Sequence, residues 1–584
     1  MRRNCSRSLT AAIAFAPFLS VPAVAEAATV ANPLCPNNTA MFNPDNGKDI
    51  VVPEGFTVSV FASGLNTPTG IAFLGNSKRF QVYVLESGHG LPSVCNEQGS
   101  FGTGTFDPKN PFTPDILVFD QFGNKIGSPL GKPNAAGTGF QAAGPAVDIA
   151  FENGLSGGRL FASDSNQATH AAGQNNSSRI VTVDPSTGKV TPFITGLPTG
   201  DHPTEQFAFK GGWIYWSQGS TTNSGVVGRD NGNGANQQDI PCENITLSQN
   251  VFDSGGGVKT SGYSPFNTQR PGATVAAFES ALHHGVCDGA ILRAKLNAAN
   301  PENTIEPFSW GYRNGYAIRF APDDHPLAGG LLVGEDGPDE RGARPSNGAP
   351  DNLHLAKQNA DGTPDYHGWP DRYGFLPSSQ AVFNPIGGTS DDLCVPIIPP
   401  NPPVACTAAS LALIHTEDVP IRDVLAFPPQ EITAPLAIEA ADSSFTGIDF
   451  APKSFVEGPV ERGAALYALE GDFGFSPPNA TAPAPEVGHE VKLINFDQKS
   501  DKPLALQIQR FAHNPVAMPD QSFVTGTSAF NRPTNVRFGP DGCAYVVDYG
   551  AVRDNGADSH FVGAGNGPLV QIPGTGVIYK ICPE

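Results

Sequence analysis

The hydrophobic and polar positions of this chain repeat one pattern. A Pro or Gly turn precedes an apolar run that ends in Phe, and a variable turn then leads to a run of β-branched and aromatic residues that ends at an acidic, Ser or Gly position. Short apolar runs bounded by turn residues predict β-strands. The first run occurs at 68–73, 147–151, 206–209, 316–320, 446–450 and 534–538, and the second at 82–86, 160–164, 214–217, 331–335, 466–470 and 544–548.

Six copies of a two-strand pattern predict an all-β fold, a six-bladed β-propeller in which each copy supplies the two inner strands of a blade. Outer strands are expected at runs such as 179–183 and 290–293, and the uneven spacing of the copies requires long loops between strands. The runs at 57–61 and 576–581 belong to no copy. We expect these N- and C-terminal strands to pair in one blade, because that pairing closes the ring and removes exposed edges.

Composition supports this fold and narrows the partners. Gly (66) and Pro (55) make up about a fifth of the 584 residues, which works against long helices. The net charge of −21 would repel a phosphate backbone, so no nucleic-acid partner is expected. The acidity fits either a solvated surface or carboxylate loops that also bind Ca²⁺.

The N-terminus has the features of an export signal. Arg2, Arg3 and Arg7 precede an apolar run at 9–24 and a small-residue pattern at 23–27. We therefore predict a secretory signal peptide at 1–27, a periplasmic or secreted protein, and no transmembrane segment in the mature chain. An N-terminal extension is expected at 28–50, and the propeller at 51–584.

The cysteines favour disulfides. Nine are present and Cys5 leaves with the signal peptide, so an even number remains in an oxidising compartment. Several pairings are compatible with the sequence, and pairing of neighbours gives 35–95, 242–287, 394–406 and 543–582. The third pair would close a loop within the Pro-rich insertion at 375–439, which we interpret as a loop and not as a second domain.

Three segments near predicted inner strands could carry chemistry, because the loops of a propeller converge on its centre. His202 directly precedes the third copy and could act as a general base, or could be an ordinary surface histidine. Arg313-Asn314 precedes the fourth copy and could bind a planar anion, or could form a structural ion pair. The turn at 334–342 contains Gly337-Pro338 among carboxylates, an environment that suits Ca²⁺.

These segments, taken together and in this order, resemble the glucose/sorbosone dehydrogenase family, the soluble quinoprotein sugar dehydrogenases with a six-bladed propeller. The resemblance is strongest from about 197 to 375 and is closer to the sorbosone branch. Its motifs are Leu197 to His202, Ile214 to Ser220, Gly311 to Asn314, Glu335 to Glu340, and Tyr366 to Pro370.

The resemblance implies oxidation of a sugar, polyol or related alcohol or aldehyde by hydride transfer to pyrroloquinoline quinone (PQQ), assisted by Ca²⁺. His202 would take the hydroxyl proton, Arg313 would stabilise the oxyanion that develops on the quinone, and Asn314 and Arg532 would bind the cofactor. No haem motif occurs in the chain, so electrons would pass to a separate acceptor, which could be a cytochrome, a quinone or a soluble mediator.

The same resemblance makes the main-chain carbonyl groups of Gly337 and Pro338 the calcium ligands. The chain also departs from the family at several positions. Ser220 stands where the glucose-type enzymes have an Asp that orients the catalytic His, Thr534 stands where a second Arg is expected, and no Lys occurs near 470–472. The two missing cations should weaken binding of a tricarboxylate cofactor.

Two alternatives of a different class remain open. One is a non-catalytic propeller that keeps the scaffold and binds a glycan or a protein. The other is a metal-dependent lactonase or hydrolase, whose ligands would be the acidic residues at strand ends. Those residues are Glu86, Asp164, Glu335, Glu470 and Asp548, and they could equally well hydrogen-bond within their own blades.

Overall fold

The computed structural model of the protein is built almost entirely from β-strands. It describes residues 28–31, 39–88, 113–166, 175–228, 231, 237–254, 258–339, 342–344, 346, 349–372, 381–382, 392–393, 419–420, 422–471, 487–497, 504–515, 528–554 and 569–584. Within these ranges there is no α-helix, and nothing helical has the length and hydrophobicity to cross a bilayer. Short 3₁₀ turns occur at η1 (Asp45–Gly47), η2 (Gly154–Ser156), η4 (Pro301–Thr304) and η5 (Lys453–Phe455).

Six antiparallel sheets form the blades, numbered here by the chain order of their inner strands. Blade 1 is β4 (Pro68–Asn76), β5 (Arg79–Glu86) and β6 (Asp115–Asp120), blade 2 is β7 (Ile149–Phe151), β8 (Leu160–Asp164), β9 (Ser178–Val183) and β10 (Val190–Leu197), and blade 3 is β11 (Thr204–Lys210), β12 (Trp213–Gln218), β17 (Ala290–Lys295) and β18 (Glu306–Trp310). Blade 4 is β19 (Asn314–Phe320), β20 (Leu331–Asp336), β22 (Pro350–Ala356) and β27 (Ala437–Ala441), blade 5 is β28 (Phe445–Phe450), β29 (Ala465–Leu469), β30 (Glu490–Asp497) and β31 (Ala505–His513), and blade 6 is β32 (Pro533–Phe538), β33 (Ala544–Asp548), β36 (Gly576–Pro583) and β3 (Phe56–Leu65).

The predicted six-bladed propeller is confirmed. Every copy of the sequence pattern forms the first and second strands of one blade, and the inner strands touch in the order β4, β7, β11, β19, β28 and β32, after which β32 touches β4 again. The chain therefore closes a ring. An edge segment extends blade 1, where Leu130 and Ile116 exchange two backbone hydrogen bonds. The short strand β23 (Asp365–Tyr366) adds to the outer edge of blade 3 in parallel orientation.

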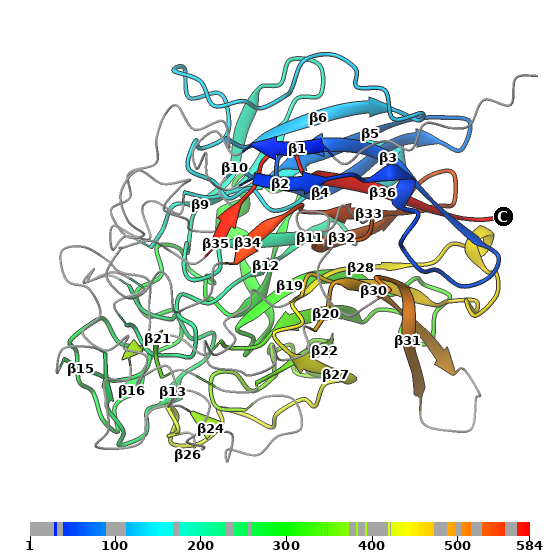
Figure 1. The fold of residues 1–584 in the computed structure, drawn as a ribbon. Helices are drawn as coiled ribbons and strands as arrows, with labels where there is room; N and C mark the ends of the chain where they lie inside the picture. The colour runs from blue at the N-terminus through cyan, green and yellow to red at the C-terminus, as the bar shows by residue number, and fades with distance from the viewer. Residues whose placement is uncertain are drawn as a thin grey trace, which may run out of the picture.

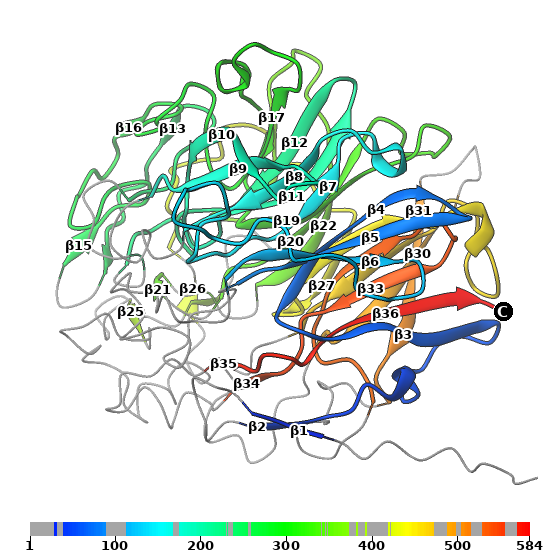
Figure 2. The same ribbon diagram turned by 90° about the horizontal axis from the view of Figure 1, so that it is seen from above.

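Blade 6 joins the two ends of the chain, as the sequence predicts. The N-terminal strand β3 pairs antiparallel with the C-terminal strand β36, from Phe56 opposite Pro583 to Leu65 opposite Gly576. Figure 1 and Figure 2 show these strands, β3 in blue and β36 in red, lying side by side. Because β36 also pairs with β33, the C-terminal strand is covered on both edges.

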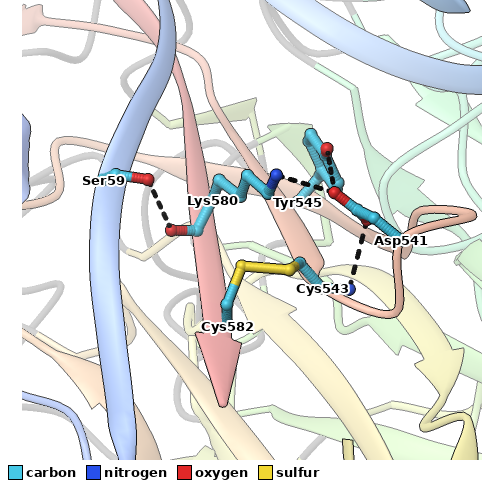
Figure 3. Close-up of a disulfide and its surroundings, with 6 residues drawn as sticks. All are labelled: Ser59, Asp541, Cys543, Tyr545, Lys580 and Cys582. Atoms are coloured by element: carbon cyan, nitrogen blue, oxygen red, sulfur yellow. Dashed lines mark hydrogen bonds and ion pairs between the residues drawn. A yellow bond between two sulfur atoms is a disulfide. The ribbon is translucent and has the colours of Figure 1, made fainter. Parts of the chain in front are cut away.

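A disulfide reinforces this closing blade. Cys543, just before β33, is bonded to Cys582 in β36, which confirms one of the predicted pairs (Figure 3). Beside it, Lys580 forms an ion pair with Asp541 at 2.7 Å. The predicted pair Cys242–Cys287 is also formed. Cys35, Cys95, Cys394 and Cys406 lie outside the described residues, as does the predicted signal peptide at 1–27.

Aromatic residues hold neighbouring blades together, which accounts for the abundance of Phe. Each junction has at least one ring pair with centroids 4.8 to 5.5 Å apart, mostly edge to face, a favourable arrangement for aromatic rings. From junction 1–2 around to junction 6–1 the pairs are Tyr83–Phe151, Phe161–Phe209, Tyr215–Phe320, His325–Phe450, Phe455–Phe538 and Phe73–Tyr545.

Several two-stranded antiparallel ladders lie outside the six blade sheets. They are β1 (Ala28–Ala31) with β2 (Thr39–Phe42), β13 (Ile245–Thr246) with β16 (Thr274–Val275), β14 (Phe252–Asp253) with β15 (Lys259–Thr260), β21 (Gly342–Ala343) with β25 (Asp392–Leu393), β24 (Ala381–Val382) with β26 (Val419–Pro420), and β34 (Val552–Asp554) with β35 (Leu569–Gln571). The last residues of the predicted insertion, 437–439, belong to β27, so this segment returns the chain to the outer edge of blade 4.

Candidate functional site

One edge of the ring gathers the predicted site residues. In each blade, antiparallel pairing puts the start of the first strand beside the end of the second, as with Asn314 opposite Asp336 and Pro533 opposite Asp548. We call this edge the site rim. His202, Arg313 and Arg532 lie just before first strands, and Gly337 lies just after a second strand, so the fold places all four on the site rim.

The His202 loop is held by a close crossing of two backbone segments. His202 donates its backbone N–H to the carbonyl of Ser220 at 3.1 Å, and Gly219 donates to the carbonyl of Pro203 at 3.0 Å. A Cβ atom at Gly219 would lie 2.2 Å from the Cβ of His202, far inside contact distance. Glycine at this position is therefore what allows His202 to occupy its place.

Arg313 belongs to the same hydrogen-bonded unit, although it lies in the next blade. The backbone N–H of Ser220 donates to the carbonyl of Arg313 at 2.9 Å, and the N–H of Arg313 donates to Oε1 of Glu335 at 2.8 Å. The loops that enter blades 3 and 4 are thus fixed relative to each other.

The guanidinium of Arg313 is 3% exposed and binds three oxygens. Nη2 donates to Oδ2 of Asp201 at 3.1 Å and to Oδ2 of Asp339 at 2.6 Å, and Nη1 donates to the carbonyl of Gly337 at 2.9 Å. The structural ion pair considered above therefore exists. Nε of Arg313 is buried with no hydrogen-bond partner among the residues the structure describes, so the guanidinium keeps one donor for a further polar group.

The imidazole of His202 lies between two carboxyl groups. Nε2 is 3.6 Å from Oδ2 of Asp201, and Nδ1 is 3.8 Å from Oε1 of Glu205. The Asp201 carboxylate therefore contacts both His202 and Arg313, which brings the two predicted catalytic residues together. Ser220 does not orient the imidazole, because its hydroxyl donates to the carbonyl of Thr222 at 2.6 Å.

Asn314 lies next to Arg313 and is 1% exposed. Its Nδ2 donates to Oδ2 of Asp336 at 3.0 Å, and its Oδ1 has no partner within the described ranges. Burial raises the pKa of Asp336 well above its usual value, with Asp351 adding to the shift and Arg313 opposing it. A buried amide oxygen and a guanidinium N–H without partners form a pair of sites that a polar ligand could satisfy.

Arg532 lies on the site rim in another set of contacts. Its Nη1 donates to the carbonyl of Gly471 at 3.1 Å, and its backbone N–H donates to Oδ1 of Asp548 at 3.0 Å. Burial raises the pKa of Glu470 to about 7, and the charge of Arg532 opposes that shift. Glu470 also raises the pKa of Asp336, which Arg313 lowers, so Arg532 and Arg313 act on the charges of neighbouring buried carboxyl groups.

The predicted calcium ligands sit beside Arg313. Carbonyl oxygens are the type of ligand that Ca²⁺ prefers, but the carbonyl of Gly337 already accepts from the guanidinium, and Pro338 is buried. In the part of the chain that the structure covers, no three His, Cys, Asp or Glu side chains form a group that could hold a metal. A calcium ion here would therefore depend on carbonyl oxygens, and it would compete with Arg313 for the oxygen of Gly337.

The strand-end carboxylates mostly serve their own blades. Glu86 accepts from the N–H of Asn66 at 2.6 Å, Glu335 accepts from Arg313, and Asp548 accepts from Asn531 and Arg532. Asp164 pairs with Arg179 at 2.6 Å. These contacts match the structural interpretation of the acidic residues, and none of them assembles a metal site.

Two features were missed from the sequence. The first is Glu205, which directly precedes the run predicted at 206–209 and has no role in the sequence-based hypothesis; an acidic residue at the start of an inner strand is the available signal. The second is a buried chain in which His354 lies 2.7 Å from Glu335 and 3.1 Å from His367, and His367 lies 3.0 Å from Asp365. Burial lowers the pKa of His367, opposed by its bond to Asp365. The sequence gives no signal for this chain, which lies next to Arg313 because Glu335 accepts a hydrogen bond from the backbone N–H of Arg313.

No family model matches the sequence, and no curated protein matches it either. Solved structures with similar folds include the holo form of the PQQ domain of pyranose dehydrogenase from Coprinopsis cinerea, with 13% identity and a TM-score of 0.46 over 91% of this chain and 97% of that chain. Another is a calcium structure of a Trichoderma reesei carbohydrate-active enzyme of family AA12, with 13% identity and a TM-score of 0.46 over 94% and 99%. The apo form of the soluble aldose sugar dehydrogenase from Escherichia coli has 13% identity and a TM-score of 0.43 over 91% and 100%. None of the three is described as a sorbosone dehydrogenase.

Proposed function

We propose that this protein is an exported quinoprotein oxidoreductase that oxidises a sugar, polyol or related alcohol or aldehyde with PQQ and Ca²⁺. The observation that carries the proposal is the double contact of Asp201, whose carboxylate lies 3.6 Å from Nε2 of His202 and 3.1 Å from Nη2 of Arg313. A general base and a fixed cation, from adjacent blades, are thereby held at one point of the site rim. A bare scaffold does not require that arrangement.

In this proposal the chain supplies binding and proton chemistry. His202 takes the proton of the substrate hydroxyl; its side chain is 23% exposed, although Nε2 itself is buried, so the substrate must reach Nε2 from within the site. Arg313 and Asn314 bind polar oxygens and nitrogens through the buried Nε and Oδ1 atoms that lack partners in the described structure. Arg532 supplies a second positive charge further along the rim. When bound, the quinone supplies the hydride acceptor.

Calcium in this proposal is bound by the carbonyls of Gly337 and Pro338. Its chemical contribution is the polarisation of a nearby oxygen as a Lewis acid. Binding requires the guanidinium of Arg313 to share or release the Gly337 oxygen. Electrons then leave to a separate acceptor, for which a cytochrome, a quinone and a soluble mediator are all suitable candidates.

A non-catalytic propeller is the second candidate, and one observation favours it. The guanidinium of Arg313 is already bonded to two carboxylates and a carbonyl, which is also the arrangement of a purely structural arginine. Under this alternative, His202 would be a loop histidine and the protein would bind a glycan or a protein partner.

Reconstitution of the purified apoprotein separates the two. PQQ and Ca²⁺ are added, binding is followed by the change in the PQQ absorption spectrum, and dye reduction is measured across sugars, polyols and aldehydes. We expect cofactor-dependent turnover that His202→Ala reduces by about a hundredfold or more. His284→Ala, at an exposed histidine, is the matched control and should retain turnover. No spectral change and no turnover on any substrate would exclude the dehydrogenase.

A further inference from the structure

We propose that Glu205 is the positioning residue for His202, holding the imidazole through Nδ1 and so taking the place of the carboxylate that this chain lacks at Ser220. The inference rests on the proposed role of His202 as the base. It starts from the separation of 3.8 Å between Oε1 of Glu205 and Nδ1 of His202. This is longer than a hydrogen bond, but catalytic hydrogen bonds often shorten only when substrate binds.

Among the described residues, no backbone N–H group donates a hydrogen bond to the Glu205 carboxyl group. The carboxylates of Glu86 and Asp548 bind backbone N–H groups of their own blades. Glu205 is 1% exposed, and its Oε2 has no hydrogen-bond partner in the described part of the chain. A buried carboxyl group without such partners is costly to keep. The imidazole of His202, 3.8 Å away, is a basic group with which this carboxyl can pair.

Two other described residues close to His202 already have partners. Asp201, on the same loop, lies at Nε2 and is paired with Arg313 from the next blade. Ser220 uses its hydroxyl on Thr222. Glu205 is therefore the carboxyl group on the Nδ1 side of the ring. When it accepts the Nδ1 proton, the lone pair of the neutral imidazole is fixed at Nε2, where a base is needed.

The surroundings of Glu205 make the pair sensitive to pH. Burial, with a contribution from Asp148, raises the pKa of Glu205 well above its usual value. At low pH the pair therefore holds two protons, one shared between Glu205 and Nδ1 and one on Nε2. The lone pair of Nε2 becomes free only when the pair loses one of them. Replacing Glu205 with an uncharged residue should let the imidazole lose this proton at a lower pH, because the negative charge of a nearby carboxylate stabilises the protonated imidazole.

The test is made on the apoprotein and needs no cofactor. Diethylpyrocarbonate modifies only the unprotonated imidazole, so the rate of modification of the His202 peptide, measured by mass spectrometry from pH 5 to 9, gives a titration midpoint. We expect Glu205→Gln to lower that midpoint by about one pH unit. Glu86→Gln removes another buried carboxyl group at the site rim, away from His202, and should leave the midpoint unchanged.

A merely structural role for Glu205 would change the rate at all pH values and leave the midpoint in place, and that result would overturn the proposal. Circular dichroism and the melting temperature establish that each variant is folded. If Glu205→Gln does not fold, Glu205→Asp serves instead, because it keeps the charge but withdraws it from Nδ1. It should lower the midpoint by a smaller amount, and an unchanged midpoint again overturns the proposal.

The outcome can be separated from that of the proposed function. A lowered midpoint without turnover on any substrate would support the His202–Glu205 pair and reject the dehydrogenase. Turnover with an unchanged midpoint would reject the role of Glu205 alone. If both hold, the acidic limb of the profile of kcat/KM against pH should move to lower pH in Glu205→Gln, together with the modification midpoint.

Discussion

Arg537 of blade 6 donates a hydrogen bond from Nη2 to Oε1 of Gln206 of blade 3 at 2.8 Å. Blades 3 and 6 are three positions apart in a ring of six, so side chains from opposite blades meet at this level. Gln206 continues the link by donating from Nε2 to the carbonyl of Thr446 in blade 5 at 2.8 Å. These cross-ring contacts tie three blades together beneath the site rim.

Replacing Arg537 should therefore destabilise the whole ring. Arg537 is 6% exposed, and its Nη1 also donates to the carbonyl of Ile448 at 2.8 Å. In Arg537→Met these acceptors and the nearby buried Asp148 lose a positive charge. Breaking a buried charged network costs about 3–5 kcal/mol. Urea unfolding at pH 7 should show a loss of free energy of unfolding of that size.

Arg319→Met is the matched control. The Arg319 side chain is 37% exposed and pairs with Asp449 at 2.7 Å, and such partly exposed pairs contribute about 1 kcal/mol or less. A loss in Arg537→Met no larger than that in Arg319→Met would contradict the stabilising role of the cross-ring contacts.

The fold could be predicted from the sequence because each blade of a propeller repeats the same pattern of strands. The runs ending at Phe73 and Phe538 look alike in the sequence, and both form the innermost strand of a blade. Even the ring closure could be anticipated, from two terminal runs without a copy of their own. The edge segment around Leu130 was not anticipated, because it pairs through isolated bridges and has no strand-like pattern.

The site could be predicted from the sequence only in part, because contacts between blades leave no pattern in a linear sequence. The motif containing His202 identified the loop, but the 3.8 Å approach of Glu205 depends on how that loop folds back over the start of β11. Likewise, the sequence predicts the carbonyl of Gly337 as a calcium ligand. The structure shows that this oxygen already accepts a hydrogen bond from Arg313.

The crossing at Gly219 gives a direct prediction about His202. Gly219→Ala places a Cβ 2.2 Å from the Cβ of His202, so the loop must move. A displacement of about 1 Å near reacting groups can cost about a hundredfold in rate. We expect cofactor-dependent turnover to fall by at least about tenfold, and the rate of His202 modification by diethylpyrocarbonate to change.

Ser220→Ala, one residue further on, provides the comparison. Its hydroxyl contacts Thr222 and not the imidazole, so turnover should stay within about twofold of the original protein. If Ser220→Ala lost as much activity as Gly219→Ala, the hydroxyl would have to orient His202 after all.

Competition at the Gly337 carbonyl predicts an unusual effect on calcium. Arg313→Met frees this oxygen and leaves Asp201 and Asp339 without the guanidinium they share. Both changes increase the attraction for a divalent cation. Isothermal titration of the apoprotein should show calcium affinity rising by about tenfold, while cofactor-dependent turnover is lost. Weaker calcium binding in Arg313→Met would contradict a shared oxygen.

The buried pair of Glu86 and Asp115 predicts how stability depends on pH. The two residues face each other across β5 and β6, and burial, with the charge of Asp115, raises the pKa of Glu86 to about 8. In the unfolded chain the same group titrates near 4.5. The folded protein therefore binds the extra proton between these values, and the stabilisation it provides is complete below about 4.5 and is lost as pH rises through about 8.

Glu86→Gln removes this titration while keeping an acceptor for the N–H of Asn66, which Glu86 binds at 2.6 Å. The free energy of unfolding, measured in urea from pH 5 to 8, should fall with pH less steeply in the variant than in the original protein. The expected difference in the total fall is about 3.5 kcal/mol, since most of the change in pKa from 4.5 to about 8 falls within this range and each pKa unit corresponds to about 1.4 kcal/mol. Parallel curves would mean that Glu86 is already ionised in the folded state, with Lys132, 3.4 Å from Asp115, compensating both charges.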